Sequence, residues 1–252
     1  MKLKSNKSPR ERRSFNKSSS VKGQYFVDSL SAINEYLRFR PEVIIGIFAS
    51  AKDLDGLRDE VLKQGLSSDI VRPLEGSQYS STGAVVKLKE KKWDHFIREL
   101  DRPTNNLVVM LDHITDPRNL GAIARSCAFF GVQSIIVASN RQVLFSQASV
   151  ATAMGGFALV DLVVVSSLAS ALGSMKDSDY QIWGADQNGE PISGQLSSDQ
   201  RKVLVLGSEQ SGLSKSVQGI CDHFVKISGS DSSLESLNVS VAAGILLHSF
   251  AE

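Results

Sequence analysis

The sequence lacks any long hydrophobic run, and no segment approaches the roughly 18 consecutive apolar residues that a membrane-spanning helix needs. No apolar stretch follows the charged N-terminus, as one would in a secretory signal. We therefore expect a cytoplasmic protein that spans no membrane. Cysteine is also scarce, and the two thiols, Cys127 and Cys221, lie in apolar helical patterns without the short spacing of metal ligands. This favours buried thiols over a disulfide or a zinc site.

Acidic residues are almost absent from positions 1–22. This segment holds eight lysines and arginines against Glu11 alone, a net charge of +7, whereas residues 23–252 hold 20 basic and 26 acidic residues, a net charge of −6. Serine is frequent in the segment and apolar residues are rare, so we predict a disordered basic tail at 1–22. Such a tail either binds phosphates or keeps the protein in solution, and the sequence leaves both roles open.

Residues 23–90 form the first globular region. Apolar residues at helical spacing alternate there with short apolar runs, and Pro41 ends the first helix. The expected elements are a helix with Val27, Leu30, Ile33 and Leu37 on one face, a strand at 43–48, a helix at 54–62, and short strands at 70–71 and 84–88. We predict a small α/β domain of a size that can fold alone.

A charged segment at 91–106 is predicted to be a linker with a connecting helix, and a second α/β region follows at 107–252. Its expected strands lie at 107–111, 134–137, 159–165, 181–185, 203–206 and 224–227, and its expected helices at 120–130, 146–154, 168–175, 213–221 and 236–250. Strands with near-continuous Val, Leu and Ile are typical of a parallel sheet with helices on both faces. Ligands of such sheets bind at the carboxyl ends of the strands.

The first loop with unusual residues follows the strand at 107–111. Asn119 is placed to cap the next helix, and Gly121 permits close approach of a partner to the helix start. Arg125 would lie near the helix N-terminus and oppose the helix dipole, an unfavourable placement that an anionic partner would explain; a solvated or salt-bridged arginine is the alternative, and the sequence leaves both open. His113 is expected to be a hydrogen-bonding loop residue.

Two further loops carry polar residues. After the strand at 203–206, Gly207 and Gly212 flank Glu209, whose carboxylate can accept hydrogen bonds; a plain strand-to-helix turn is the alternative. The spacing is neither GxGxxG nor a Walker motif, which argues against a nucleotide-dependent oxidoreductase. The third loop, 227–238, is rich in serine and glycine and leads into the apolar final helix, which Asn238 is predicted to cap.

Together the three loops resemble the three motifs of the SpoU (TrmH) family of RNA ribose 2′-O-methyltransferases, within the SPOUT class. The matching residues are Asp116-Pro117, Asn119, Gly121 and Arg125, then Gly207, Glu209, Gly212 and Leu213, then Ser236-Leu237-Asn238. Two positions depart from the pattern: Ile227 is followed by serine where the family usually has proline, and Gln210 stands where glycine is frequent. These departures concern the loop backbone around a cofactor more than the class of activity.

The resemblance implies an α/β fold with a C-terminal SPOUT domain, a parallel sheet with a deep trefoil knot, preceded by a small L30e-like RNA-binding domain at 23–90. It implies S-adenosylmethionine as cofactor, a homodimer, and no metal. The implied cofactor-binding residues are Leu206, Gly207, Ile227, Ser236 and Leu237, and the implied catalytic residues are Asn119, Arg125, Glu209 and Asn238. The implied substrate is a guanosine ribose of 23S rRNA; a tRNA substrate, or a non-catalytic RNA-binding or ribosome-assembly protein on the same fold, remains the alternative.

Overall fold

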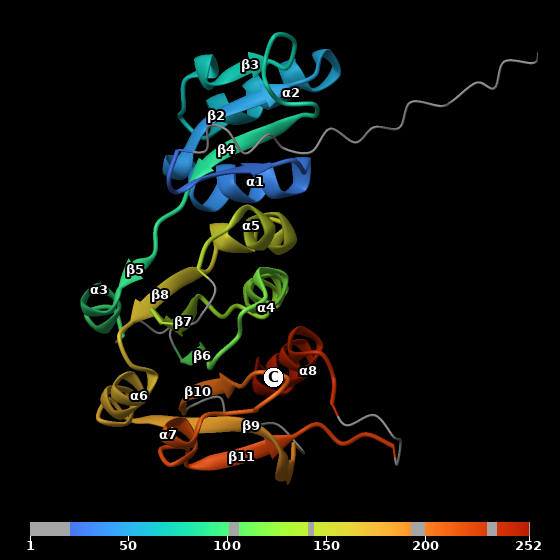
Figure 1. Cartoon of the computed structure of the whole chain (residues 1–252). Helices are drawn as coiled ribbons and strands as arrows, with labels where there is room; N and C mark the ends of the chain where they lie inside the picture. The colour runs from blue at the N-terminus through green and yellow to red at the C-terminus, as the bar shows by residue number, and fades with distance from the viewer. Residues whose placement is uncertain (1–20, 101–105, 141–143, 193–199, 231–235, 252) are drawn as a thin grey trace, which may run out of the picture.

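The computed structural model describes residues 21–100, 106–140, 144–192, 200–230 and 236–251, which form two units, each built around its own sheet (Figure 1). Most of the predicted basic tail, 1–20, lies outside the described residues. Within them, no helix is both long and apolar enough to cross a membrane.

The N-terminal unit contains a mixed four-stranded sheet in the order β1-β4-β2-β3. Its elements are β1 (Gln24–Val27), α1 (Leu30–Phe39), β2 (Ile44–Ala49), α2 (Ala51–Lys63), β3 (Val71–Pro73) and β4 (Gly83–Lys87). Strand β1 was not predicted, and Val27, which was expected in the first helix, ends this strand instead. The helix begins after Ser29, whose hydroxyl accepts a hydrogen bond from the N–H of Ala32.

The C-terminal unit contains a seven-stranded sheet in the order β11-β9-β10-β6-β7-β8-β5, and all neighbouring strands run parallel. The strands are β5 (Lys91–Lys92), β6 (Leu107–Leu111), β7 (Ser134–Ala138), β8 (Asp161–Val165), β9 (Tyr180–Pro191), β10 (Arg201–Leu206) and β11 (His223–Lys226). The predicted parallel sheet is thus confirmed.

Helices cover both faces of this sheet (Figure 1). On one face lie α4 (Pro117–Phe129), α5 (Gln147–Ala153) and α8 (Val239–Ala251), and on the other α3 (Trp93–Ile97), α6 (Leu168–Lys176) and α7 (Lys215–Gln218). Successive side chains of a strand point to opposite faces, so Val109 and Leu111 join the first core whereas Val108 and Met110 join the second. This double burial explains why the strands are apolar at nearly every position.

Part of the predicted linker belongs to the larger sheet. Within 91–106, β5 pairs with β8, and Phe96 of α3 is buried in the second core; residues 101–105 lie outside the described residues. The predicted helix at 213–221 is also shorter than expected, because α7 covers only Lys215–Gln218.

Contacts between the two units fix their junction. The side-chain amide of Gln147 accepts a hydrogen bond from the N–H of Phe26 at 2.9 Å and donates one to its carbonyl at 2.6 Å. Arg40 forms an ion pair with Asp161 at 2.7 Å. Gly155 lies so close to α1 that a β-carbon there would meet Ala32 at 3.1 Å. The N-terminal unit is therefore held directly against α5 and the start of β8.

Candidate active site

The three loops that carry the sequence motifs meet at the carboxyl ends of β6 and β10 and the start of α8. The side-chain amide of Asn238 donates to Glu209 Oε1 at 2.7 Å and to Asn119 Oδ1 at 3.1 Å. Asn119 also donates to Glu209 Oε1, at 3.3 Å. The structure therefore brings together three of the predicted catalytic residues, although they are far apart in the sequence.

Glu209 is the common acceptor of this cluster. Besides the two asparagine amides, its carboxylate accepts the N–H of Val239 at 3.1 Å, in the first turn of α8. A carboxylate at a helix N-terminus is also stabilised by the helix dipole. Asn238 caps the same helix, since its Oδ1 accepts the N–H of Ser240 at 2.9 Å, which confirms the predicted N-cap. Glu209 thus ties the second loop to the third.

Two glycines shape the loop that presents Glu209. Ser208 and Gly212 exchange backbone hydrogen bonds of 3.1 and 2.9 Å, and Gly212 adopts a left-handed φ of 62°. A β-carbon on Gly207 would lie 2.3 Å from the carbonyl carbon of Gly212. Both positions therefore need glycine in order to close a tight loop, independently of any ligand.

The start of α4 differs from the prediction. The helix begins at Pro117, and its N-cap is Asp116, whose carboxylate accepts the N–H of Arg118 at 2.8 Å. The prediction that Asn119 caps the helix is therefore wrong. The side-chain amide of Asn119 instead lies inside the first turn of α4 and forms hydrogen bonds with Glu209 and Asn238 of the other two loops. Gly121 does allow close approach, but of α5: a β-carbon there would lie 2.4 Å from the carbonyl oxygen of Ser149.

Arg125 also lies elsewhere in its helix than the sequence suggested. Because α4 spans Pro117–Phe129, Arg125 falls in its second half, where a positive charge does not oppose the helix dipole. The argument from the dipole for an anionic partner is therefore wrong. The side chain is exposed, and within the described part of the chain it makes no hydrogen bond or ion pair. It lies about 9 Å further along the helix than Asn119, at a rise of about 1.5 Å per residue.

A buried carboxylate that the sequence did not single out joins the first loop to the second. Asp112, at the end of β6, has a side chain only 2% exposed; it accepts the N–H of Ser214 at 2.7 Å and lies 2.7 Å from Nδ1 of His113. His113 is thus a hydrogen-bonding loop residue, as predicted, with a left-handed φ of 59°. The only signal for Asp112 in the sequence was its place as an acidic residue at the end of an otherwise apolar strand.

The predicted cofactor-binding residues line the edges of the second and third loops. Leu206 is buried at the end of β10, while Gly207 and Ile227 are half-buried. Ser236 and Leu237 are exposed, and Leu237 leaves 47% of its surface open between two polar residues. An exposed apolar side chain beside backbone amide and carbonyl groups suits a ligand with a flat, partly polar ring. Of the loop expected to differ from the family pattern, residues 231–235 lie outside the described residues.

The two cysteines are unsuited to metal binding or nucleophilic chemistry. Cys127 is buried, as predicted, whereas Cys221 is half-buried. Burial raises the pKa of the Cys221 thiol to about 11 and also raises that of Cys127. Both thiols are therefore protonated near neutral pH, and the thiolate is the reactive form. Among the residues that the structure describes, no three His, Cys, Asp or Glu side chains are grouped so as to hold a metal ion.

Comparison with solved structures shows a shared fold. The SpoU methyltransferase AviRb from Streptomyces viridochromogenes, solved in complex with AdoMet, matches with a TM-score of 0.72 and 22% identity over 91% of this chain and 90% of that chain. An RNA methyltransferase of the TrmH family from Porphyromonas gingivalis matches with a TM-score of 0.67 and 22% identity, covering 90% of this chain and 89% of that chain. The α/β fold with a parallel-sheet domain is therefore that of SpoU/TrmH proteins of the SPOUT class.

Sequence comparison identifies the family. An uncharacterised tRNA/rRNA methyltransferase of Mycolicibacterium smegmatis is 39% identical over 145 residues, which cover 58% of this chain and 46% of the relative. A second one, from Mycolicibacterium paratuberculosis, is 38% identical over 141 residues, 56% of this chain and 45% of that protein. The matches thus span about half the length of these relatives. The model of the SpoU rRNA methylase family matches residues 106–248, more than half of the chain. The chain belongs to the SpoU rRNA methylase family.

Proposed function

We propose that this protein transfers a methyl group from S-adenosylmethionine to a ribose 2′-hydroxyl of RNA. The observation that carries the proposal is the hydrogen-bonded cluster of Asn119, Glu209 and Asn238, which joins the three motif loops at the carboxyl ends of β6 and β10. Parallel sheets bind their ligands at this edge. Membership of the SpoU family and the AdoMet complex of AviRb support the choice of reaction and cofactor.

The residues around the second and third loops fit the proposed cofactor. The backbone groups of Gly207, Ile227 and Leu237 would hold the adenine edge, and Leu206 and Ser236 complete the walls. The exposed side chain of Leu237 would lie against the ring. When bound, the cofactor supplies a methyl group on a positively charged sulfur. Glu209 keeps the two loops together by accepting hydrogen bonds from Asn238 and the N–H of Val239.

Arg125 is proposed to bind an RNA phosphate and to orient the ribose hydroxyl. A guanidinium has a pKa above about 12, so it is a poor general base near neutral pH. It is well suited to a phosphate, because its planar fork of N–H groups matches two phosphate oxygens. Its side chain is exposed. Orientation of the hydroxyl toward the methyl group can lower the barrier by several kcal/mol.

The preferred substrate is a guanosine in 23S rRNA, with the N-terminal unit acting as an L30e-like RNA-binding domain. A tRNA substrate is the alternative, and the names of the relatives include both RNA classes. The decisive measurement is a map of 2′-O-methyl sites in total RNA from cells with and without this protein. We expect one guanosine of 23S rRNA to lose its methyl group and to regain it with the wild-type chain but not with an Arg125→Ala chain. Loss of a tRNA site would favour the alternative substrate, and an unchanged map would contradict the proposal.

A non-catalytic RNA-binding protein on the same fold is the second candidate, because the third loop departs from the family pattern at Ser228. Calorimetry with S-adenosylmethionine separates the two. Heat that saturates at one cofactor per chain is the result expected of the enzyme. The absence of heat at high cofactor concentration would favour the non-catalytic protein.

We also propose that two copies of the chain associate through α4 and α8. These helices pack together, and the ring of Phe130, the residue that follows α4, stacks on His248 of α8 with centroids 6.0 Å apart. Large apolar side chains stay exposed on the same two helices: Phe129 is 83% exposed, Val241 51% and Ile245 39%. Clustered exposed apolar side chains mark association surfaces. A symmetric dimer would bury them.

Introducing a charge on this surface tests the dimer. We expect the wild-type chain to sediment as a dimer at micromolar concentration and Ile245→Asp to sediment as a monomer, because a carboxylate cannot be buried without a partner. Leu62→Asp is the matched control, since Leu62 is 55% exposed on α2, away from this surface. A wild-type monomer, or a dimer that persists in Ile245→Asp, would argue against the interface.

A further inference from the structure

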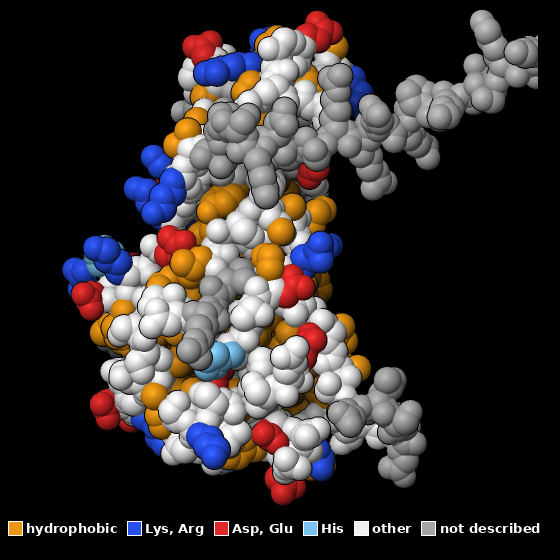
Figure 2. Space-filling view, viewed as in Figure 1, with side chains coloured by type: hydrophobic (Ala, Val, Ile, Leu, Met, Phe, Trp, Pro, Cys, Tyr) orange, Lys and Arg blue, Asp and Glu red, His pale blue; other side chains and the backbone are white. Residues whose placement is uncertain are grey.

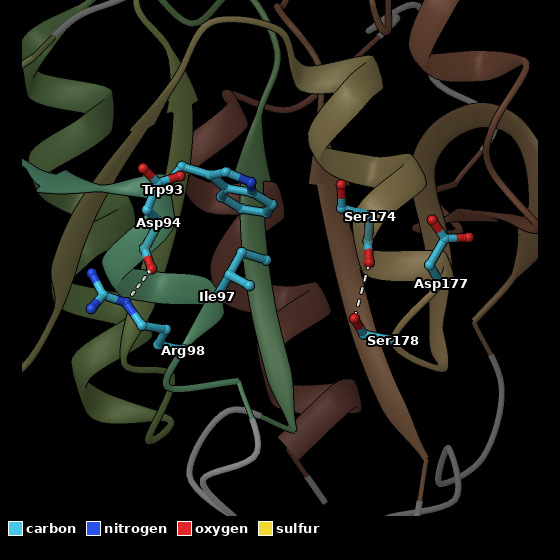
Figure 3. A pocket seen from close by; sticks show the side chains of 7 residues that line it. All are labelled: Trp93, Asp94, Ile97, Arg98, Ser174, Asp177 and Ser178. Atoms are coloured by element: carbon cyan, nitrogen blue, oxygen red, sulfur yellow. Dashed lines mark hydrogen bonds between the residues drawn. The ribbon is translucent and has the colours of Figure 1, made fainter.

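A groove of about 460 Å³ lies between α3 and the C-terminal end of α6 (Figure 3). It is on the face of the sheet that carries α3, α6 and α7, whereas the candidate active site involves α4 and α8 (Figure 1). Its volume falls in the range of about 300–1,000 Å³ that is usual for small-molecule sites. The groove is therefore a separate candidate binding site, which the proposed methyl transfer does not use.

One wall of the groove is aromatic and apolar. Trp93 and Ile97 lie one helical turn apart on α3, and both point toward α6 in Figure 3. Both side chains are half-buried, so the indole keeps part of its surface open to the groove. Phe96 packs against the indole with ring centroids 5.4 Å apart, which fixes its orientation. The wall thus presents a rigid, flat aromatic surface.

The other lining side chains are polar. Ser174, Asp177 and Ser178 line the groove from α6 and the turn after it, and the hydroxyl of Ser178 donates to the carbonyl of Ser174 at 3.0 Å. Arg98 lies at the rim, where its Nε donates to the carbonyl of Asp94 at 3.0 Å (Figure 3). A flat ring bound against Trp93 would therefore lie in a groove whose other lining side chains are mostly polar.

Basic residues gather next to this groove. The segment 87–98 holds five lysines and arginines against two acidic residues, a net charge of +3, whereas the rest of 23–252 carries −9. Lys91 is engaged by Glu99 and Asp161, but Lys87, Lys89 and Lys92 are exposed. Figure 2 shows basic side chains along the left edge of the molecule, over α3 and the segment that leads from β4 to β5. This edge is suited to a chain of phosphates.

We propose that the groove binds one unpaired nucleotide of the RNA substrate, with its base against Trp93 and its phosphates on Lys92 and Arg98. Single-stranded RNA is recognised in this way, by aromatic stacking of a splayed base, hydrogen bonds to its edge, and cations along the backbone. The carboxylates of Asp94 and Asp177 can accept hydrogen bonds from base N–H groups. The inference deepens the proposed function, because it rests on RNA being the substrate.

The two tryptophans of the chain allow a direct test of base stacking. A Trp183→Phe variant retains only Trp93, and a Trp93→Phe variant retains only Trp183, which stacks on His223 in the other core. The probe is a single-stranded oligoadenylate of about ten nucleotides. We expect saturable quenching of the indole fluorescence in Trp183→Phe and no quenching in Trp93→Phe. Absence of quenching in Trp183→Phe, or equal quenching in both, would overturn the proposal.

Affinity measurements extend the test to the groove residues. We expect Trp93→Ala to weaken oligoadenylate binding about tenfold, as truncation of a stacking aromatic does elsewhere. Arg98 is exposed, so Arg98→Gln does not alter the core and can replace Trp93→Ala in the test if that variant fails to fold. We expect Arg98→Gln to weaken oligoadenylate binding severalfold. The double variant Lys89→Gln with Lys92→Gln should lower the salt slope of log Kd by about 1.4, or about 0.7 for each phosphate that is no longer neutralised. Unchanged affinity and slope in these variants would contradict the site.

Failure of the groove proposal can be distinguished from failure of the proposed methyl transfer. Binding of S-adenosylmethionine is measured on each groove variant, and we expect it to match that of the wild type, because the groove lies on the opposite face of the sheet from α4 and α8. If the wild-type chain binds no cofactor and methylates no RNA, the proposed function fails, while quenching of Trp93 still decides the groove.

Discussion

Replacement of Arg125 by alanine is expected to lower the single-turnover rate of RNA methylation about 100-fold or more, while cofactor binding stays near the wild-type value. The side chain is exposed and, within the described residues, engages no other group, so its loss should not disturb the fold. If it holds a phosphate and thereby orients the ribose hydroxyl, its removal leaves the hydroxyl misplaced by an ångström or more, a change that can cost about 100-fold in rate. The single-turnover rate is measured by quenched flow, with the RNA that the map of 2′-O-methyl sites identifies as the substrate.

Two further variants separate orientation from simple attraction of RNA. Arg118→Ala removes an exposed positive charge from the first turn of the same helix and should leave the single-turnover rate at saturating RNA within about threefold of wild type. Arg125→Lys keeps the charge but not the planar fork, so we expect an intermediate rate. If Arg125→Ala retained activity within about threefold of wild type with RNA binding intact, the role assigned to this residue would be wrong.

The strands of the larger sheet could be predicted because burial on both faces leaves a clear signal in the sequence. The predicted strand at 107–111 coincides with β6, whose residues are nearly all buried. Strands β1 and β5 could not be found in this way. Val27 of β1 happens to be in phase with the apolar face of the next helix, and β5 is a two-residue edge strand that exists only through its pairing with β8.

Sequence reasoning brought the three motif loops to one edge of the sheet, but it did not give the contacts between them. The rule that ligands bind at the carboxyl ends of parallel strands indicated that these loops lie at one edge of the sheet. The choice of Asn119, Glu209 and Asn238 within them came from the family resemblance. The start of α4 was misplaced, because the apolar periodicity begins at Leu120 whereas the polar cap Asp116 begins the helix. Asp112 left no periodic signal, since it is a single carboxylate whose partners, the N–H of Ser214 and the ring of His113, are set by the fold.

Replacement of Gly207 by alanine is expected to abolish binding of S-adenosylmethionine and to destabilise the protein by about 1–3 kcal/mol, the usual cost of inserting a methyl group where there is no room. The new β-carbon would lie 2.3 Å from the carbonyl carbon of Gly212 and 2.6 Å from the N–H nitrogen of Leu213. Because both are backbone atoms, no side chain can rotate to make space. The loop must open, and Glu209 would then be drawn away from Asn238 and Val239 at the start of α8.

The matched control is Gly173→Ala on α6. A β-carbon at Gly173 would meet no atom within 4 Å, so alanine should raise the stability by up to about 1 kcal/mol through its higher helix propensity. Urea unfolding and calorimetry with the cofactor measure both variants. Cofactor binding by Gly207→Ala at the wild-type affinity would contradict the role of this loop. Loss of cofactor binding in Gly207→Ala but not in Gly173→Ala is the result expected if the closed loop that begins at Gly207 holds the cofactor.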